Sequence, residues 1–528
     1  VNANGTFDIS QTTAGATIQS LSGNGAAVLG SKTLTLSTAS GSFDGVISGS
    51  GGLNVTGGTE TLTGVNTYTG ATTVSGGTLN LTGSLASTVV TVDGGALTSA
   101  NGGMASGTNL TINSGAANIN ADQSIAQLNG AGGNVALASG KALTVNNGGS
   151  FAGTVSGAGL LQVAGGTMAL SGINTHSGGT QVNAGAALSI NSGTALGTGT
   201  LDLIGTSNTT ATLNVLGATT IANQIKVSGD PTFNIASGTI TTVSGSIFDG
   251  SSPGDVVVTG AGTLNLSAAN TYSGQTTVTN GTTLVLNGSG SIENSSLVTN
   301  NGTLDISQTT SGASIKTLSG SGSLLTASGK DLTLINANDT FAGAISGAGK
   351  VIVAAGTETL TGTNTHSGGT QINAGAVLSI NSGSALGSGV LDLVGTNSTT
   401  ATLNVLNTTT ISNQIKVSGD PTFNIASGTT TTINSPITDG SLPGDVVVAG
   451  TGTLNLSAAN TYTGSTGIDA GATLALSGSG SVAASSGVNA NGTFDISQTT
   501  AGATIKSLSG NGAAALGSQT LTLSAASG

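Results

Sequence analysis

The stretch GTLNLSAANTYSGQTTVTNGTTLVLNGSGSIENSSLVTNNGTLDIS, residues 262–307, contains the pattern that decides the fold. In it, and again in a later copy, the first apolar residue of a strand-like segment recurs every 20 residues: Leu264, Leu284 and Leu304, then Leu454, Leu474 and Phe494. A strand that returns so soon leaves no room for a crossover helix and is typical of a coiled solenoid. The spacing predicts an all-β protein, a parallel β-helix with coils of about 20 residues.

Alternation of apolar and polar residues marks further strands along the chain. It is present in residues 32–37 (KTLTLS), 59–63 (TETLT), 78–82 (TLNLT) and 109–113 (NLTIN). Because successive side chains of a strand point to opposite faces, one face of each segment is apolar and the other is polar. Gly, Asn and Ser bound these segments and suit the corners of a coil. No helical period is evident.

The composition fits thin, stacked layers. The chain has 89 Gly, 5 Pro, no Trp and only 2% aromatic residues, so its apolar residues are mainly Val, Leu, Ile and Ala. A tandem array of immunoglobulin-like domains is the rival, since one repeat is close to the size of such a domain. A sandwich needs bulky side chains to fill about 10 Å between its sheets, and a 20-residue period has no place in it. The β-helix is therefore preferred.

Charge excludes several classes of partner. Charged residues make up 5% of the chain, and 8 cations, all lysine, face 20 acidic residues for a formal charge of -12. A surface of this kind argues against nucleic acid and anionic membranes as partners. The absence of Cys excludes a disulfide framework, and no apolar run is long enough to span a bilayer.

Repeats at larger scales define the predicted organisation. Residues 1–41 return as 488–528 with four differences, and residues 176–270 match 366–460 at an offset of 190. The predicted units are residues 1–297 with an extra sub-repeat, residues 298–487, and the start of a further repeat at 488–528. A chain that repeats its own beginning is expected to be part of a longer tandem array.

Within these repeats the sequence Asn-Thr-[Tyr/His]-[Ser/Thr]-Gly occurs five times. Its asparagines and its aromatic or histidine residues are candidate structural positions: Asn66, Tyr68, Asn174, His176, Asn270, Tyr272, Asn364, His366, Asn460 and Tyr462. The two histidines stand where other copies have tyrosine, and one catalytic site would not be duplicated at a position that accepts Tyr. We interpret the motif as a stacked corner or core ladder rather than a catalytic or sugar-binding site.

Residues 262–292 and 452–482, with a further good copy at 59–83, resemble the passenger-associated repeat of bacterial autotransporters. The resemblance implies a right-handed parallel β-helix passenger, exported with the help of a signal and of an outer-membrane barrel that would lie elsewhere in the full-length chain. It also implies a stalk of the kind found in adhesins or in carriers of an enzymatic domain. The expected location is extracellular, at the cell surface, either anchored to the outer membrane or secreted.

Candidate chemistry is sparse. The loops DGSSPGD and DGSLPGD contain weak calcium candidates, Asp249 with Asp255 and Asp439 with Asp445, although solvated corner loops are the preferred interpretation. A site for degrading acidic polysaccharides needs carboxylates clustered with Arg or Lys, and the chain has no Arg. We therefore expect no catalytic residues, no cofactor and no enzymatic activity.

The sequence predicts a structural and adhesive surface protein. Stacked coils would give stiffness, and repeated polar faces would hold other copies of the chain, a host or abiotic surface, or glycans through many weak contacts. Two alternatives stay open. The chain could be a carrier stalk for an enzymatic domain outside this sequence, or a self-assembling extracellular filament subunit.

Overall fold

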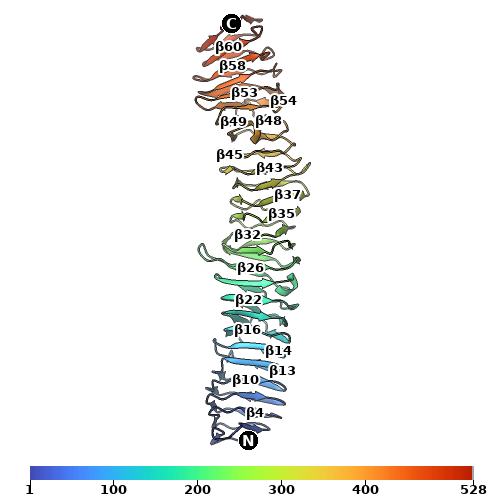
Figure 1. The fold of residues 1–528 in the computed structure, drawn as a ribbon, viewed down its shortest axis with the longest axis vertical. Helices are drawn as coiled ribbons and strands as arrows, with labels where there is room; N and C mark the ends of the chain where they lie inside the picture. The colour runs from blue at the N-terminus through green and yellow to red at the C-terminus, as the bar shows by residue number, and fades with distance from the viewer. Residues whose placement is uncertain (526–528) are drawn as a thin grey trace. The chain divides into compact units, whose positions relative to one another are not determined.

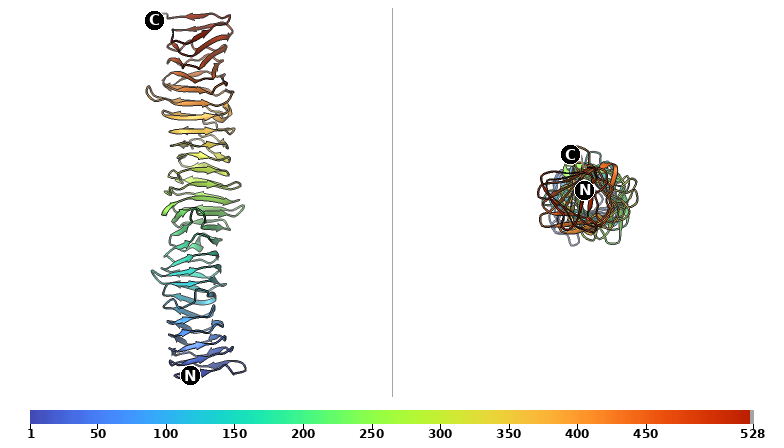
Figure 2. Two further views of the ribbon diagram at one scale, coloured as in Figure 1. Left: turned by 90° about the vertical axis from the view of Figure 1, so that its left-hand side faces the viewer. Right: turned by 90° about the horizontal axis from the view of Figure 1, so that it is seen from above.

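The computed structural model describes residues 1–525, which form two compact units. The first unit holds Val1–Leu264 with Tyr272–Gly274, and the second holds Asn265–Thr271 with the residues from Gln275 onward. In each unit, short strands lie one above another in successive turns of the chain (Figure 1). A second view shows the strands of each unit running across its stack (Figure 2). The end of the predicted repeat 488–528 falls on residues 526–528, which lie outside the described residues.

Strands from equivalent positions of successive turns form long parallel sheets in the first unit. One sheet has the order β15 (Gln123–Ile125), β18 (Ala142–Val145), β21 (Leu160–Val163), β23 (Thr180–Val182), β25 (Leu201–Ile204), β28 (Ile225–Gly229) and β31 (Ile247–Gly254). Another path runs through β2 (Ala16–Ile18), β4 (Leu34–Leu36), β7 (Leu53–Val55), β10 (Thr72–Val74), β13 (Val89–Ser99), β14 (Asn109–Ile119) and β16 (Gln127–Asn129). Their order follows the chain because each turn stacks on the turn before it.

The second unit repeats this arrangement in three long sheets. The first contains β38 (Ala313–Ile315), β41 (Leu332–Leu334), β44 (Val351–Val353), β46 (Thr370–Asn373), β48 (Leu391–Val394), β51 (Ile415–Gly419) and β54 (Ile437–Gly444). The second contains β42 (Thr340–Phe341), β45 (Gly356–Leu360), β47 (Ala376–Ile380), β49 (Thr402–Val405), β52 (Thr422–Ile425), β55 (Val446–Gly450), β57 (Thr466–Ile468), β59 (Val488–Ala490) and β62 (Leu508–Ser509). The third contains β50 (Thr409–Ile411), β53 (Thr430–Ile433), β56 (Thr453–Leu456), β58 (Thr473–Gly478), β60 (Thr493–Thr499) and β63 (Ala513–Ala515).

The alternation seen in the sequence decides which side chains are buried. In β4, Leu34 and Leu36 are fully buried while Thr35 between them is half-buried on the outer face. Since each turn repeats this alternation of buried and outward side chains, apolar side chains form continuous interior columns. Burying one Leu side chain contributes about 2 kcal/mol to stability relative to exposing it. Polar columns accompany them: Asn234 donates to Asn214 at 2.8 Å, and Asn214 donates to Ser189 at 3.2 Å.

The turns are not uniform in length. Thr72 pairs with Val90 of the next turn, whereas Leu188 pairs with Leu213, so the second of these turns is clearly the longer one. The longer turns accommodate the short 3₁₀ helices η1 (Gly193–Leu196) and η2 (Gly383–Leu386). An even spacing is thus an average, and insertions at the corners leave the sheets in register.

The predicted fold class is confirmed. The chain is an all-β solenoid of parallel strands with about 26 turns of roughly 20 residues each. The boundaries at 297 and 487, which rest on sequence repeats alone, stay predictions. No helix within residues 1–525 is long and apolar enough to cross a membrane.

Candidate functional site

The asparagine of the repeated Asn-Thr-[Tyr/His] motif ties successive turns together. The Asn364 Oδ1 accepts a hydrogen bond from the Ile345 amide at 2.8 Å, and its Nδ2 donates to the Ala385 carbonyl at 2.6 Å. Its partners belong to the turn before and the turn after. The other copies make the same kind of bond: Asn66 with Ile47 and Ser84, Asn174 with Val155 and Ala195, Asn460 with Ile437 and Ser481, and Asn270 with Ser291. Buried backbone groups at the corner are thereby satisfied.

The residue two positions later is the Tyr or His of the motif, and it is buried in each copy: Tyr68, His176, Tyr272, His366 and Tyr462. The His366 Nε2 lies 3.0 Å from the Thr370 Oγ1, and that hydroxyl donates its proton to the Leu386 carbonyl. The imidazole must therefore donate its Nε2–H to Thr370. Tyr462 meets Thr466 in the same way at 2.6 Å.

Tyr and His are interchangeable at this position because each side chain presents one hydrogen-bond donor to the buried threonine four residues later in its own copy. Burial lowers the pKa of His366 to about 4 and also lowers that of His176. Both rings are therefore neutral at physiological pH, and their Nδ1 atoms are buried without a hydrogen-bond partner among the described residues. A fully buried ring of this kind does not meet a substrate, which favours the structural interpretation of the motif.

The two acidic loops already supply donors to their own carboxylates. The Asp439 Oδ1 accepts from the amides of Gly444 and Thr463, both at 3.0 Å, and its Oδ2 accepts from the Thr463 hydroxyl at 2.7 Å. Burial alone would raise the pKa of Asp439, but these hydrogen bonds outweigh it and lower the pKa. Asp249 in the first unit is held in the same way by Gly254 and Ser273.

Asp445, at the end of the same loop, accepts from the Ser465 amide and hydroxyl at 2.6 and 2.7 Å. Its neighbour is Asp420, whose pKa is raised by burial and by the charge and hydrogen bond of Asp445. Stacking thus places Asp420 next to Asp445 of the following turn. Asp255 occupies the Asp445 position in the first unit. Among residues 1–525, no group of three or more His, Cys, Asp or Glu side chains gathers as a metal site would require. Calcium binding stays a weak prediction.

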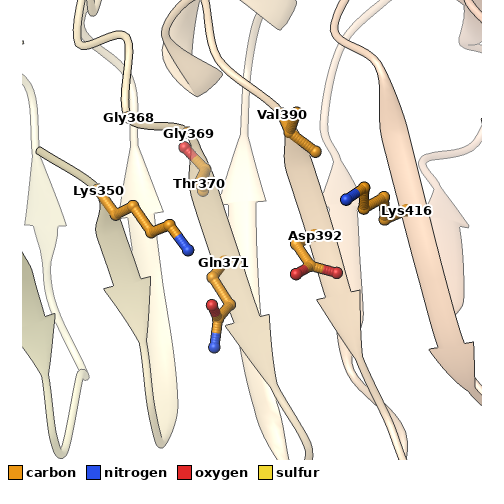
Figure 3. Close-up of a pocket in the computed structure, with 8 residues that line it drawn as sticks. All are labelled: Lys350, Gly368, Gly369, Thr370, Gln371, Val390, Asp392 and Lys416. Atoms are coloured by element: carbon orange, nitrogen blue, oxygen red, sulfur yellow. The ribbon is translucent and has the colours of Figure 1, made fainter. Parts of the chain in front are cut away.

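A small pocket in the second unit was missed by sequence reasoning. It has a volume of about 180 Å³ and is lined by Lys350, Gln371, Asp392 and Lys416, with Thr370, Val390 and the two glycines at 368 and 369 (Figure 3). Burial raises the pKa of Asp392, while the charges of Lys416 and Lys350 oppose that increase. Two of the eight cations of the chain therefore meet around one half-buried carboxylate.

Two buried glutamates were also missed. Glu60 and Glu358 are fully buried where other copies of the strand have Leu264, Leu454 or Met168. Within residues 1–525, neither oxygen of Glu358 has a hydrogen-bond partner. Burial, reinforced by the nearby charge of Asp339 and opposed by the Leu318 amide, raises the pKa of Glu358 to about 9. The signal was available in the alignment of the repeats, where a Glu replaces an inward-facing apolar residue.

Comparison with known families supports the resemblance. The family model described as the passenger-associated-transport-repeat matches five segments: residues 57–81, 165–190, 256–286, 355–380 and 446–479. Comparison with curated proteins gave no match, and comparison with solved structures gave none either. Each matched segment contains strands of the solenoid, and together the matches are distributed across both units. The five matches show that the chain carries autotransporter passenger repeats, which together with the solenoid fold support an exported, repetitive β-helical passenger at the cell surface or secreted.

Proposed function

We propose that this passenger is a structural and adhesive stalk that holds surfaces and glycans through polar columns on its outer faces. The observation that carries the proposal is the register of outward side chains. Along one sheet of the first unit, seven consecutive turns place a Thr or Asn at the same outward position: Thr17, Thr35, Asn54, Thr73, Thr91, Thr111 and Asn129.

Regular spacing makes such a column suited to adhesion. Adjacent strands of a sheet lie about 4.8 Å apart, so the hydroxyl and amide groups recur at that interval. Each contact with a hydroxylated surface is weak, but contacts on one rigid scaffold add without a further loss of translational freedom. The many weak bonds can then hold a partner that no single group would hold.

A structural role is supported over a catalytic one by the placement of the two histidines. Both lie in the core, each bonded to a threonine that stabilises its own turn. The low content of charged residues, 5% of the chain, suits recognition by hydroxyl and amide groups. Partners of this kind are glycans, hydroxylated host or abiotic surfaces, and other copies of the chain.

The proposal is tested by removing hydroxyl groups while keeping shape. Thr73→Val, Thr91→Val and Thr111→Val would be combined in the purified chain, and its adhesion to polysaccharide-coated beads would be measured. Because Val has high β-propensity, the fold should be retained, as circular dichroism would check. We expect adhesion to fall at least about tenfold, equivalent to about 1.4 kcal/mol shared by three contacts.

A matched control carries the same substitution at one outward position in each of three different sheets: Thr220→Val, Thr333→Val and Thr504→Val. These residues lie on three strands that do not pair with one another, β27 (Thr219–Ile221), β41 and β61 (Ala503–Ile505). The control therefore removes no more than one hydroxyl group from any one column. The control should adhere as the unchanged chain does. Undiminished adhesion of the column variant would contradict the proposal.

A further inference from the structure

We propose that Lys350, Gln371 and Asp392, supported by Lys416, form a binding site for an acidic sugar. The ligand class is a sugar ring that bears one carboxylate and several free hydroxyl groups. This inference rests on the proposed adhesive function and names a ligand class for one place on the passenger. It is carried by the geometry of the pocket, the state of its charged groups and an internal duplicate that lacks the key lysine.

Strand register brings the residues together. Gln371 of β46 pairs with Asp392 of β48, and Asp392 pairs with Lys416 of β51, so the three side chains stand in one outward column. Lys350 immediately precedes β44, one turn before Gln371. Figure 3 shows the Lys350 and Gln371 side chains extending over the same part of the sheet, with Asp392 beyond them. Two strand spacings separate Lys350 from Asp392, which is about 10 Å between backbones.

The two ammonium groups of the pocket are unengaged. Within the described residues, neither the Lys350 nor the Lys416 Nζ makes a hydrogen bond or an ion pair, whereas the Nζ of Lys316 and that of Lys506 each donate to a backbone carbonyl. The Asp392 Oδ1 is buried and also lacks a hydrogen-bond partner. The Asp202 Oδ1 of the first unit is buried in the same way, so the features that distinguish this pocket are the free ammonium groups at its edges and the Asp392 carboxylate that lines it.

A hydroxylated carboxylic acid satisfies these groups together. Its carboxylate pairs with Lys350, its ring lies over Gln371, and one of its hydroxyls donates to the Oδ2 of Asp392, the carboxylate oxygen that is not enclosed. Lys416 is a positioning residue, since its charge opposes the rise in the Asp392 pKa and so favours the carboxylate, which accepts hydrogen bonds. Sulfate has no proton to donate to the Asp392 carboxylate, and the charge of Asp392 would repel it. A neutral sugar would leave Lys350 without a counter-charge. The small volume of about 180 Å³ fits one ring rather than a large ligand.

The first unit contains a duplicate of this surface without the site. In the matching segment of the repeat, Leu160 stands in place of Lys350, while Gln181, Asp202 and Lys226 are retained. In that copy Lys226 lies 3.1 Å from the Asp202 carboxylate and forms an ion pair with it. The Leu copy therefore has a closed pair and no free cation at the position where a ligand carboxylate would bind.

The test is ligand-observed NMR titration of the purified chain with methyl glucuronoside as the acidic sugar. Methyl glucoside serves as the neutral analogue and sulfate as the simple anion. We expect millimolar affinity for the glucuronoside, a Kd at least tenfold higher for Lys350→Leu, and no measurable binding of the glucoside. Asp392→Asn should also weaken glucuronoside binding, by about threefold or more. Because Lys350→Leu installs the residue of the duplicate copy, it should fold, and circular dichroism would verify this.

Lys141→Leu is the matched control, since the Lys141 ammonium group also has no partner among the described residues but lies outside the pocket. Its affinity should equal that of the unchanged chain. Equal binding of the glucoside, displacement by sulfate at equal concentration, or an unaffected Lys350→Leu variant would overturn the site. If polysaccharide beads are still held through the threonine column while the glucuronoside fails to bind, this site is wrong and the adhesive function stands. Binding of the glucuronoside without any bead adhesion would mean that the site is right and the adhesive function is wrong.

Discussion

Replacing Glu358 by Met should stabilise the second unit, and the gain should grow with pH. Met is the residue of the duplicate copy, at position 168, where it is fully buried. Glu358 is equally buried, and its carboxyl oxygens have no hydrogen-bond partner in the part of the chain that the structure describes. The side chain is therefore tolerated in its neutral, protonated form and strongly disfavoured as a carboxylate.

The magnitude follows from the pKa of Glu358, which rises from 4.5 to about 9 in the folded chain. Between these values the folded state holds a proton that the unfolded state has released, so stability falls as pH rises. The contribution is fully present below pH 4.5 and is lost as pH rises through about 9. One proton corresponds to about 1.4 kcal/mol per pH unit, so about 4 kcal/mol is lost between pH 4.5 and 7.5.

Hydrogen exchange is the appropriate assay, because a solenoid opens locally and a global unfolding free energy is poorly defined for a long repeat. Protection of the β45 and β47 amides would be compared between Glu358→Met and the unchanged chain at each pH. The comparison at equal pH cancels the intrinsic exchange rates and the titration of other groups. Glu358→Gln is the control, since it keeps a polar side chain but removes the titration. A difference in stability that stays constant between pH 5 and 9 would refute the reasoning.

Three further predictions concern the corner motif and the acidic loops. Burial lowers the His366 pKa from 6.5 to about 4, so the contribution of this residue to stability is present above pH 6.5 and is lost as pH falls through about 4. His366→Tyr should remove up to about 1.4 kcal/mol of this loss per pH unit, measured by hydrogen exchange of the β46 amides at each pH. Asn364→Ala leaves the Ile345 amide and the Ala385 carbonyl without their hydrogen bonds and should lower local stability by about 2 to 4 kcal/mol. The loss would be measured as faster hydrogen exchange of the Ile345 amide. Thr365→Ala, at the exposed neighbouring position, should change this exchange little. Calcium or a chelator should leave the melting temperature unchanged because the Asp439 oxygens already accept three hydrogen bonds, and an increase with calcium concentration would show that the loop binds the ion.

The fold was predictable because its determinants are local and repeat many times. Alternation of apolar and polar residues in segments such as KTLTLS predicts which side chains face inward, and Leu34 and Leu36 are buried as predicted. The recurrence of Leu454, Leu474 and Phe494 likewise predicted strands that pair directly with one another. A periodic pattern survives an occasional insertion, since each turn carries its own copy of the signal.

The pocket was not predictable, because it depends on how turns of unequal length stack. The interval from Asp392 to Lys416 is longer than the interval from Gln371 to Asp392, yet both pairs are in register. The longer interval includes a corner loop, and a fixed 20-residue period in the sequence does not predict the length of such a loop. An even spacing would have placed Lys416 elsewhere on its turn, and so the two lysines looked isolated in the sequence.

The central claim is that successive turns stack in parallel with one coil between paired residues, and engineered disulfides test it most directly. The chain has no Cys, so a pair introduced at Thr73 and Thr91 would be the only thiols. These residues are partners in adjacent strands, about 4.8 Å apart, within the range that a disulfide spans. We expect rapid oxidation to an intramolecular disulfide, detected by mass spectrometry, while a pair at Thr73 and Thr111, two turns apart, should stay reduced. Failure of the first pair, or equal oxidation of the second, would contradict the stacked β-helix.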